Sequence, residues 1–261
     1  MLIYSSQPHR AIFMKNLDKI EILILAAGKG KRMQDNLPKV LVKFNGKPMI
    51  MYVLESAGRA FKKKPIAIIG HKAELVKFEL KNLCSYVLQK EQLGTGHAIF
   101  SAKDSCINTE HIIVLSGDQP LITPKTIKNL VEKHLKSKSK ITFTTTKLPD
   151  FKDWRKAFIG FGRILRKNGK VIGIHEYKDA NEKEKNIKEV NAGCYAFDAK
   201  WLWKNLEKIK NNNVQNEYYL TDLFQIASQN GDLIETIKIK PHEALGANTK
   251  EELEILGKFA K

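Results

Sequence analysis

The segment LILAAGKGKRM combines an apolar run with glycines and three cations. Gly28 and Gly30 leave the backbone uncrowded, so its N–H groups can approach a ligand closely. The cations that would offset the charge of a polyanion are Lys29, Lys31 and Arg32. The first hypothesis is therefore a phosphate-binding loop after a buried strand. The alternative is a strand-to-helix turn that carries solvated lysines.

The standard phosphate fingerprints do not fit this loop. A Walker loop requires G-x-x-x-x-G-K-[ST], but counted from Gly28 its second glycine and its lysine fall on Met33 and Gln34. The dinucleotide fingerprint requires a third glycine at the position of Met33. The loop thus indicates phosphate chemistry of a different family.

A second candidate is the acidic residue in SGDQP, residues 116–120. Asp118 follows Gly117 at the expected end of a strand. Mg²⁺ typically takes one or two protein oxygens and leaves its other positions to water and substrate phosphates. Asp118 is therefore a candidate magnesium ligand, and an aspartate that caps the next turn is the alternative.

A third candidate is LQKEQLGTGHA, residues 88–98. The side-chain amides of Gln89 and Gln92 offer donors and acceptors that suit the edge of a base. The turn of Gly94, Thr95 and Gly96 allows close backbone approach. The alternative is a helix N-terminus capped by Thr95, with a packing role for His97.

Other kinds of active site find no support. The sequence contains neither G-x-S-x-G nor H-E-x-x-H, and its seven histidines have no metal-ligand spacing. Cys84, Cys106 and Cys194 have the spacing of neither a disulfide framework nor a zinc site, so we expect reduced thiols and a cytoplasmic protein. Phosphoryl transfer requires less chemistry from side chains, because cations and a metal can align the reacting groups and neutralise their charge.

Alternating strands and helices would position these candidates. Expected strands are 20–26, 65–70, 85–89, 111–117 and 140–146. Expected helices are 48–61, 71–82, 95–104 and 123–135. This alternation predicts a mostly parallel sheet covered on both faces. Ligands of such folds sit beyond the carboxyl ends of strands, where the glycine-rich loop and SGDQP both lie.

The pattern changes near residue 150. We expect a hairpin turning at Asn168-Gly169, a strand at NAGCYAFDA, and later helices and a strand, together forming a smaller lobe. Residues 1–19 are expected to be an extension, partly disordered. Residues 20–261 are expected to be one domain, with a nucleotide-binding part at 20–150 and a sugar-binding part at 151–261.

Composition limits the partners of the 261-residue chain. Its net charge of +17 permits the binding of nucleic acid or the attraction of anionic substrates. The lysines are dispersed, however, and no aromatic-interleaved basic stripe accompanies them, so we expect no nucleic-acid partner. No apolar run approaches the roughly 20 residues of a membrane span, so we expect no membrane partner either.

Together these motifs resemble the uridylyltransferase half of the bacterial bifunctional N-acetylglucosamine-1-phosphate uridylyltransferase/glucosamine-1-phosphate acetyltransferase family. The resemblance runs from residue 20 to 256. Its motifs are LAAGKGKRM, LPKVLVKFNGKPM, LQKEQLGTGHA, SGDQPLI, GFGRILRKNGKVIGIHEYKDA, KEVNAGCYAF, NNNVQNEYYLTD and GANTKEELEI. It implies a Rossmann-like, three-layer α/β nucleotidyltransferase fold with a mixed, mostly parallel sheet and a small sugar-binding lobe.

The resemblance also implies roles for individual residues. The nucleotide would contact Leu25, Ala26, Ala27, Gly28, Lys39, Gln89, Gln92, Gly94, Thr95 and Gly117. Arg32, Lys39 and Asp118 would be catalytic, with Asp118 and Asn248 holding Mg²⁺. The sugar would contact Gly162, Glu176, Asn191 and Thr221.

The implied substrates are UTP and a sugar-1-phosphate, whose oxygen would attack the α-phosphorus and release pyrophosphate. Four residues depart from the family pattern, chiefly on the sugar side: Ser116 and Phe161 for tyrosines, Ala192 for threonine and Asn216 for glycine. They leave open a different sugar phosphate, or a nucleotide-binding relative without turnover. The sequence lacks the hexapeptide repeats of the other half, so we expect neither acetyltransferase activity nor the trimer built by those repeats.

Overall fold

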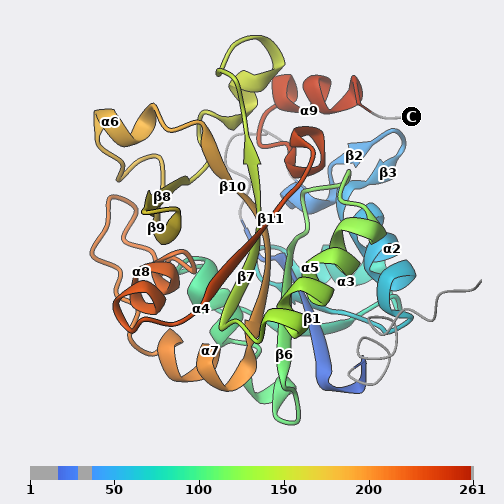
Figure 1. Ribbon diagram of the computed structural model, residues 1–261. Helices are drawn as coiled ribbons and strands as arrows, with labels where there is room; N and C mark the ends of the chain where they lie inside the picture. The colour runs from blue at the N-terminus through green and yellow to red at the C-terminus, as the bar shows by residue number, and fades with distance from the viewer. Residues whose placement is uncertain (1–16, 29–36, 260–261) are drawn as a thin grey trace, which may run out of the picture.

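The computed structural model describes residues 17–28 and 37–259, which form an α/β fold around one nine-stranded sheet (Figure 1). Seven strands lie in the order β11-β7-β10-β6-β1-β4-β5, while β8 pairs with β10 and β9 with β8. The strands are β1 Ile20–Ala26, β4 Ile66–Ile69, β5 Ser85–Leu88, β6 His111–Ser116, β7 Ile141–Lys147, β8 Arg163–Lys167, β9 Lys170–His175, β10 Glu189–Asp198 and β11 Ile234–Lys238. A two-stranded sheet pairs β2 Lys43–Phe44 with β3 Lys47–Pro48.

The predicted fold class is confirmed. Strands β6, β1, β4 and β5 are mutually parallel, β11 is parallel to β7, and β10 runs antiparallel to its neighbours. The helices are α2 Met49–Phe61, α3 Ala73–Leu80, α4 Thr95–Phe100, α5 Pro124–Ser137, α6 Glu182–Lys185, α7 Ala199–Leu206, α8 Asp222–Gln229 and α9 Lys250–Gly257. The 3₁₀ helices are η1 Leu17–Lys19, η2 Lys39–Leu41, η3 Lys103–Cys106, η4 Asp153–Phe158 and η5 Pro241–Ala244.

Helices cover both faces of the sheet because side chains alternate along its strands. In β1, Ile22 and Ile24 join the cluster packed against α2, α3 and α5. Leu23 faces the other way, into the cluster of α4, α7 and α8. A third cluster joins the segment after η2 to η5 and α9. That cluster fixes two distant segments of the chain. One follows Lys39 and the other leads to Asn248, and both of these are predicted site residues.

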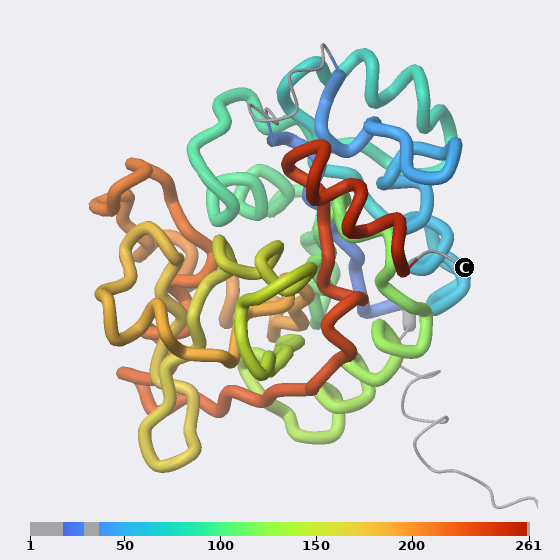
Figure 2. The backbone as a smooth tube through the Cα atoms, turned by 90° about the horizontal axis from the view of Figure 1, so that it is seen from above, coloured from blue at the N-terminus to red at the C-terminus, as the bar shows by residue number. Residues whose placement is uncertain are grey.

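The second half of the chain does not form a separate layer. Strand β10 lies between β6 and β7, so residues 151–261 contribute to the same sheet as residues 20–150. The small lobe is built mainly by β8, β9 and α6. Its hairpin turns at Asn168 and Gly169 as predicted, with φ angles of 50° and 77°. Seen from above, this yellow-to-orange part lies across from the blue-to-cyan part, with the red C-terminal segment between them (Figure 2).

Some predictions fall on residues that the structure does not describe. Of the predicted extension at 1–19, only Leu17–Lys19 is described, as η1.

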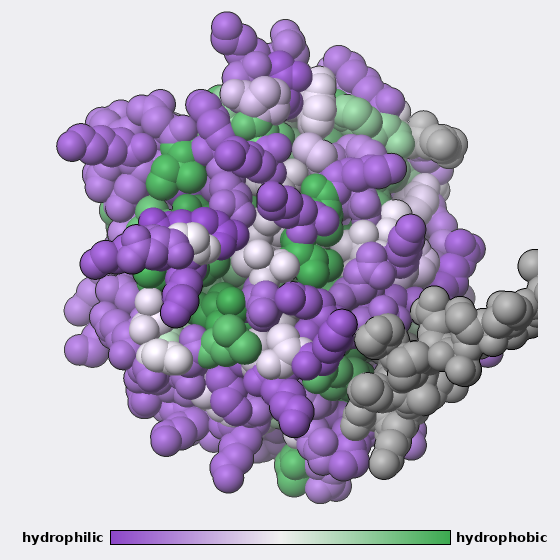
Figure 3. All heavy atoms as spheres, in the orientation of Figure 1, coloured by the Kyte–Doolittle hydropathy of each residue, from purple (hydrophilic) through white to green (hydrophobic). Residues whose placement is uncertain are grey.

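No helix in the described residues is long and apolar enough to cross a membrane. The face in Figure 3 is largely hydrophilic, with hydrophobic side chains in small separate groups.

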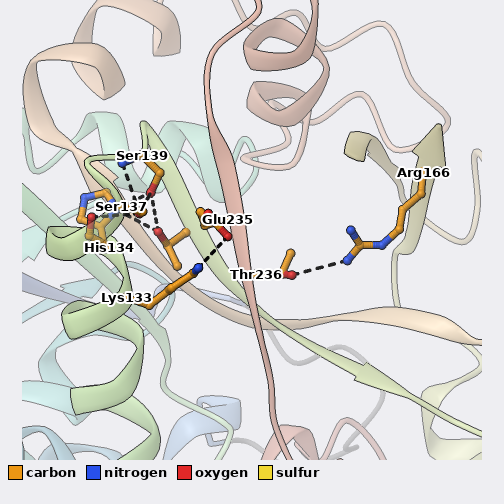
Figure 4. Close-up of polar contacts among 8 residues, drawn as sticks. Lys133, His134, Ser137, Ser139, Arg166, Glu235 and Thr236 are labelled. Atoms are coloured by element: carbon orange, nitrogen blue, oxygen red, sulfur yellow. Dashed lines mark hydrogen bonds and ion pairs between the residues drawn. The ribbon is translucent and has the colours of Figure 1, made fainter. Parts of the chain in front are cut away.

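A buried histidine joins α5 to the sheet. His134 is 1% exposed, and its Nδ1 lies 3.0 Å from Thr142 Oγ1. Its Nε2 lies 3.3 Å from Nδ1 of His111. Figure 4 shows His134 beside Ser137 and Ser139, with Lys133 nearby reaching Glu235 of β11. Burial, with a smaller contribution from the neighbouring His111, lowers the pKa of His134 to about 3.

We expect this histidine to make the fold sensitive to acid. The unfolded chain binds a proton at position 134 below about pH 6.5, whereas the folded protein does not until about pH 3, so the stability present above pH 6.5 is lost as the pH falls. Between pH 6.5 and 5.5 the free energy of unfolding should fall by about 1 kcal/mol more in the wild type than in His134→Gln. Urea unfolding at both pH values measures this difference, and equal losses in the two proteins would contradict it.

Candidate active site

The site lies where the strand order reverses. From β1 the chain continues to β4 and β5 on one side, then returns to β6 on the other. In open α/β sheets, ligands bind outside the carboxyl ends of strands at such a point. The Gly117 N–H donates to the Leu25 carbonyl oxygen at 3.0 Å. A Cβ at Gly117 would lie 2.7 Å from that oxygen, so the two strand ends can approach this closely only with glycine there.

The first predicted nucleotide segment lies at this point. Leu25 stands in register with Ser116, immediately before Gly117. Ala26 ends β1, and the Ala27 carbonyl oxygen accepts from His71 N–H at 3.2 Å. Gly28 is exposed after them. The cationic part of the loop, including Arg32, lies outside the described residues.

Three predicted residues from distant segments converge beside it. Lys39 begins η2, Asp118 follows β6, and Asn248 precedes α9. The Lys39 ammonium donates to both Asp118 Oδ2 and Asn248 Oδ1. The side chains of Lys39 and Asp118 are only 16% and 21% exposed, so this ion pair is partly shielded from water. The structure therefore brings a cation and two oxygen ligands to one point.

The donor set fits the predicted Mg²⁺. Two side-chain oxygens, one of them a carboxylate, already surround one positive group, and Mg²⁺ prefers oxygen ligands of this kind. No cluster of three or more His, Cys, Asp or Glu ligands occurs in the described residues. An ion held by Asp118 and Asn248 would therefore take its remaining ligands from water and substrate phosphates.

The residues predicted to bind the base form a folded loop. Gln89 is 3% exposed, and its Nε2 donates to the Gly94 carbonyl oxygen at 3.1 Å. That nitrogen also lies 3.0 Å from His97 Nδ1. Gln92 Nε2 donates to the Gln89 carbonyl oxygen at 3.1 Å. In the structure, both side-chain amides shape the loop.

The same loop is tied to the start of α8. Gly96 N–H donates to the Tyr218 carbonyl oxygen, and Tyr218 N–H to the Leu93 carbonyl oxygen, both at 2.7 Å. The alternative that Thr95 caps a helix is wrong, because Gly94 is the N-cap residue of α4 and no side chain caps that end. The Thr95 hydroxyl instead accepts from Leu220 N–H at 3.0 Å. These contacts connect the predicted base site to Thr221, a predicted sugar residue.

The four predicted sugar residues also come together. The Thr221 hydroxyl donates to Glu176 Oε1 at 2.8 Å. A Cβ at Gly162 would lie 3.5 Å from the same carboxylate oxygen. The Gly162 carbonyl oxygen accepts from Asn191 N–H at 2.9 Å. Burial raises the pKa of Glu176 above its ordinary value, and the hydrogen bond from Thr221 offsets only part of that rise. Asn191 Nδ2 donates to the buried Tyr195 hydroxyl at 2.6 Å.

The departures from the family pattern have identifiable places. Ser116 Oγ donates to the Gly193 carbonyl oxygen at 3.2 Å. Ala192 is fully buried in the third cluster, and the Phe161 ring packs against Phe158 with centroids 4.8 Å apart. Asn216 has a φ of 54°, a left-handed conformation that asparagine tolerates and glycine adopts freely.

Two residues that shape the site were missed by the sequence predictions. Arg163 is fully buried, and its guanidinium donates to the carbonyl oxygens of Ile159 at 2.9 Å and Lys185 at 3.1 Å. It thereby ties the segment just before Gly162 to the end of α6. Gln119 is 6% exposed and donates to two further carbonyl oxygens. A polar residue in a motif gives no sign that it will be buried, so neither stood out.

Known proteins resemble this chain in sequence and in fold. The model of the MobA-like NTP transferase domain matches residues 22–153, about half of the chain. Bifunctional protein GlmU of Streptococcus uberis is 42% identical over 231 residues, which are 87% of this chain and 49% of the relative. Bifunctional protein GlmU of Fervidobacterium nodosum is 43% identical over 244 residues, which are 93% of this chain and 51% of the relative.

The chain thus spans about half the length of these curated relatives. A crystal structure of UDP-glucose pyrophosphorylase complexed with UDP-glucose superposes with a TM-score of 0.71. It shares 19% identity and covers 92% of this chain and 97% of its own, which supports the fold alone. The resemblance of the motifs to the bifunctional bacterial family is confirmed over most of the chain, which belongs to the MobA-like NTP transferase domain family.

Proposed function

We propose that this protein transfers the uridylyl group of UTP to N-acetylglucosamine-1-phosphate and releases pyrophosphate. The observation that carries the proposal is the meeting of Lys39, Asp118 and Asn248 at the reversal point of the sheet. The similarity to bifunctional GlmU proteins over most of the chain supports the same reaction.

In this proposal the nucleotide lies over the ends of β1 and β6. The backbone from Leu25 to Gly28 and at Gly117 lines its path, and Arg32 and Lys39 bind its phosphates. The loop at Gln89 reads uracil, with the backbone at Gly94 and the side chains of Thr95 and Gln92 beside it. Residues 20–150 then serve mainly the nucleotide, and residues 151–261 the sugar.

The sugar lies toward the small lobe. Glu176 and Thr221 form one hydrogen-bonded pair and Asn191 and Gly162 another, and together they can offer oxygens and N–H groups to hydroxyls and an N-acetyl group. Together these residues cover both ends of the sugar, and the phosphate of the sugar lies toward Lys39.

The chemistry needs alignment and charge rather than a general base. A sugar-phosphate oxygen attacks the α-phosphorus of UTP, and the bond from that phosphorus to the bridging oxygen breaks as pyrophosphate leaves. The phosphate monoester is already largely dianionic at neutral pH, since its second pKa is about 6. Lys39 and Arg32 stabilise the charge of the five-coordinate phosphorus. Mg²⁺ held by Asp118 and Asn248 would neutralise charge on the triphosphate.

Pyrophosphate release from UTP and Mg²⁺, with a panel of sugar-1-phosphates, tests the proposal. We expect release with N-acetylglucosamine-1-phosphate to be faster than with glucose-1-phosphate, and faster with UTP than with other nucleoside triphosphates. Faster release with another sugar phosphate would keep nucleotidyl transfer and replace the substrate. Binding of UTP without release for any sugar would reject turnover and leave a nucleotide-binding relative.

A further inference from the structure

Gln119 occupies a buried position between two parts of the proposed site. It follows Asp118 directly and is 6% exposed. Its Nε2 donates to the Ala192 carbonyl oxygen at 3.0 Å and to the Ala244 carbonyl oxygen at 3.1 Å. Its Oε1 accepts a weak hydrogen bond from the Cys194 thiol, with Sγ 3.6 Å away. Both amide hydrogens are therefore committed to backbone groups of other segments.

One of these segments is an irregularity in β10. The pairing of β10 with β7 shifts register between Asn191 and Tyr195, so the residues between them leave the regular ladder. Gly193 has a φ of 80°, and a Cβ there would lie 2.8 Å from Gln119 Nε2. The bulge ends at Asn191, a proposed sugar ligand. Gln119 thus packs against the bulge and bonds to it.

The other segment leads to the proposed metal ligand. Ala244 ends η5, and Asn248 follows four residues later. A Cβ at Gly246 would lie 2.9 Å from the Asp118 carbonyl oxygen, so this segment passes tightly over the end of β6. Leu245 and Ala247 are buried in the third cluster, which leaves little freedom for the residues before Asn248.

We infer that Gln119 is a positioning residue: its buried amide fixes the β10 bulge that carries Asn191 and the segment that carries Asn248 in one arrangement. The inference deepens the proposed function, because it assigns to one side chain the relative placement of the sugar and the metal ligands. Substituting an apolar side chain leaves two buried carbonyl oxygens without their donor, and each segment is then free to shift.

Gln119→Met tests the inference, since methionine keeps the length of the side chain and removes its hydrogen bonds. We expect the KM for the sugar phosphate to rise about 10-fold, as one or two hydrogen bonds to substrate are weakened. The dissociation constant for Mn²⁺, measured without nucleotide by water-proton relaxation, should rise several-fold. At saturating Mg²⁺ the KM for UTP should stay within about 2-fold, because the loop at Gln89 is hydrogen-bonded to Tyr218 and Leu220 rather than held by Gln119.

The matched control is Asn205→Leu. Asn205 is 2% exposed and donates to the Trp201 carbonyl oxygen at 2.8 Å within α7, so it supplies a buried amide outside the site. Both variants should lose thermal stability, and only Gln119→Met should lose affinity for Mn²⁺ and the sugar phosphate. Unchanged affinities in Gln119→Met would overturn the inference and leave Gln119 a purely structural role. An equal rise in the KM for UTP at saturating Mg²⁺ would also overturn it.

The Mn²⁺ measurement separates this inference from the proposed function. If the wild type shows no turnover with any sugar phosphate, the proposed function fails, yet Mn²⁺ affinity still compares the two variants. If Gln119→Met does not fold, Gln119→Glu takes its place, because it keeps the side-chain length and loses at least one donor. Weaker Mn²⁺ binding in that variant, in spite of the added carboxylate, supports the inference when Asn205→Asp, the matched amide-to-carboxylate change, binds Mn²⁺ like the wild type, and equal or stronger binding would overturn it.

Discussion

Replacing Asp118 with asparagine should lower kcat about 10²- to 10³-fold and leave the fold intact. In the proposed site, this carboxylate is one of two protein oxygens available to Mg²⁺, and it faces the Lys39 ammonium. An amide keeps the size of the side chain but not its charge, so metal affinity falls and Lys39 loses its counter-ion. Pyrophosphate release and Mn²⁺ binding measure the two consequences separately.

The control is a carboxylate-to-amide change at an ion pair of another part of the sheet. Glu235 lies on the edge strand β11 and pairs with Lys133 at 3.0 Å (Figure 4). Its side chain is 29% exposed, close to the 21% of Asp118. Glu235→Gln should leave turnover and Mn²⁺ binding unchanged. Near-normal turnover in Asp118→Asn would reject the assignment of this carboxylate to the metal.

The sequence allowed the parallel part of the fold to be predicted because its signals are local. Apolar runs bounded by glycine marked β1 and β6, and helical periodicity filled the intervals between strands. Parallel strands end at one edge of a sheet, so Gly28 and Asp118 were expected near each other. The structure has this arrangement: the ends of β1 and β6 meet where the Gly117 N–H donates a hydrogen bond to the Leu25 carbonyl oxygen.

The antiparallel insertion was not predictable in the same way. β10 reads as a strand in the sequence, but nothing local indicates that it enters between β6 and β7. The pairing depends on side chains that are far apart in the chain, such as those of the third cluster. For this reason the second half was expected to be more separate than it is.

Long-range placement also explains what could be said of the candidate site. Asp118 and Asn248 were paired only through the family resemblance, since they are 130 positions apart in the sequence. The structure brings both to Lys39, a contact that neither composition nor periodicity contains. Arg163 and Gln119 were missed because their significance lies in burial, and polar residues are usually exposed.

The loop at Gly94 is the position where a single methyl group should have the second large effect. Gly94 has φ 113° and ψ 176°, a conformation open essentially to glycine alone. A Cβ there would lie 2.7 Å from the Tyr218 carbonyl oxygen and 2.8 Å from its nitrogen. Both are backbone atoms that hydrogen-bond to this loop, so neither can move aside without breaking the pairing.

We therefore expect Gly94→Ala to destabilise the fold by about 3 kcal/mol, near the upper end for backbone strain because a clash is added. For a protein of this size, that loss lowers Tm by roughly 6–12 °C. The KM for UTP should rise at least about 10-fold, which corresponds to about 1.4 kcal/mol, since the carbonyl oxygen of Gly94 also anchors Gln89. Calorimetry and steady-state kinetics measure the two effects.

Gly169→Ala is the matched control, because alanine must adopt a positive φ there as well but meets no neighbouring atom. Gly169 has a φ of 77° in the β8–β9 turn, and an added Cβ would meet nothing within 4 Å. This variant should lose only the strain of the turn, about 1 kcal/mol, with the KM for UTP unchanged. Equal losses of Tm in the two variants would mean that the loop at Gly94 yields to the added methyl group. An unchanged KM for UTP in Gly94→Ala would separate this loop from recognition of the base, because the geometry that holds Gln89 would then be irrelevant to binding.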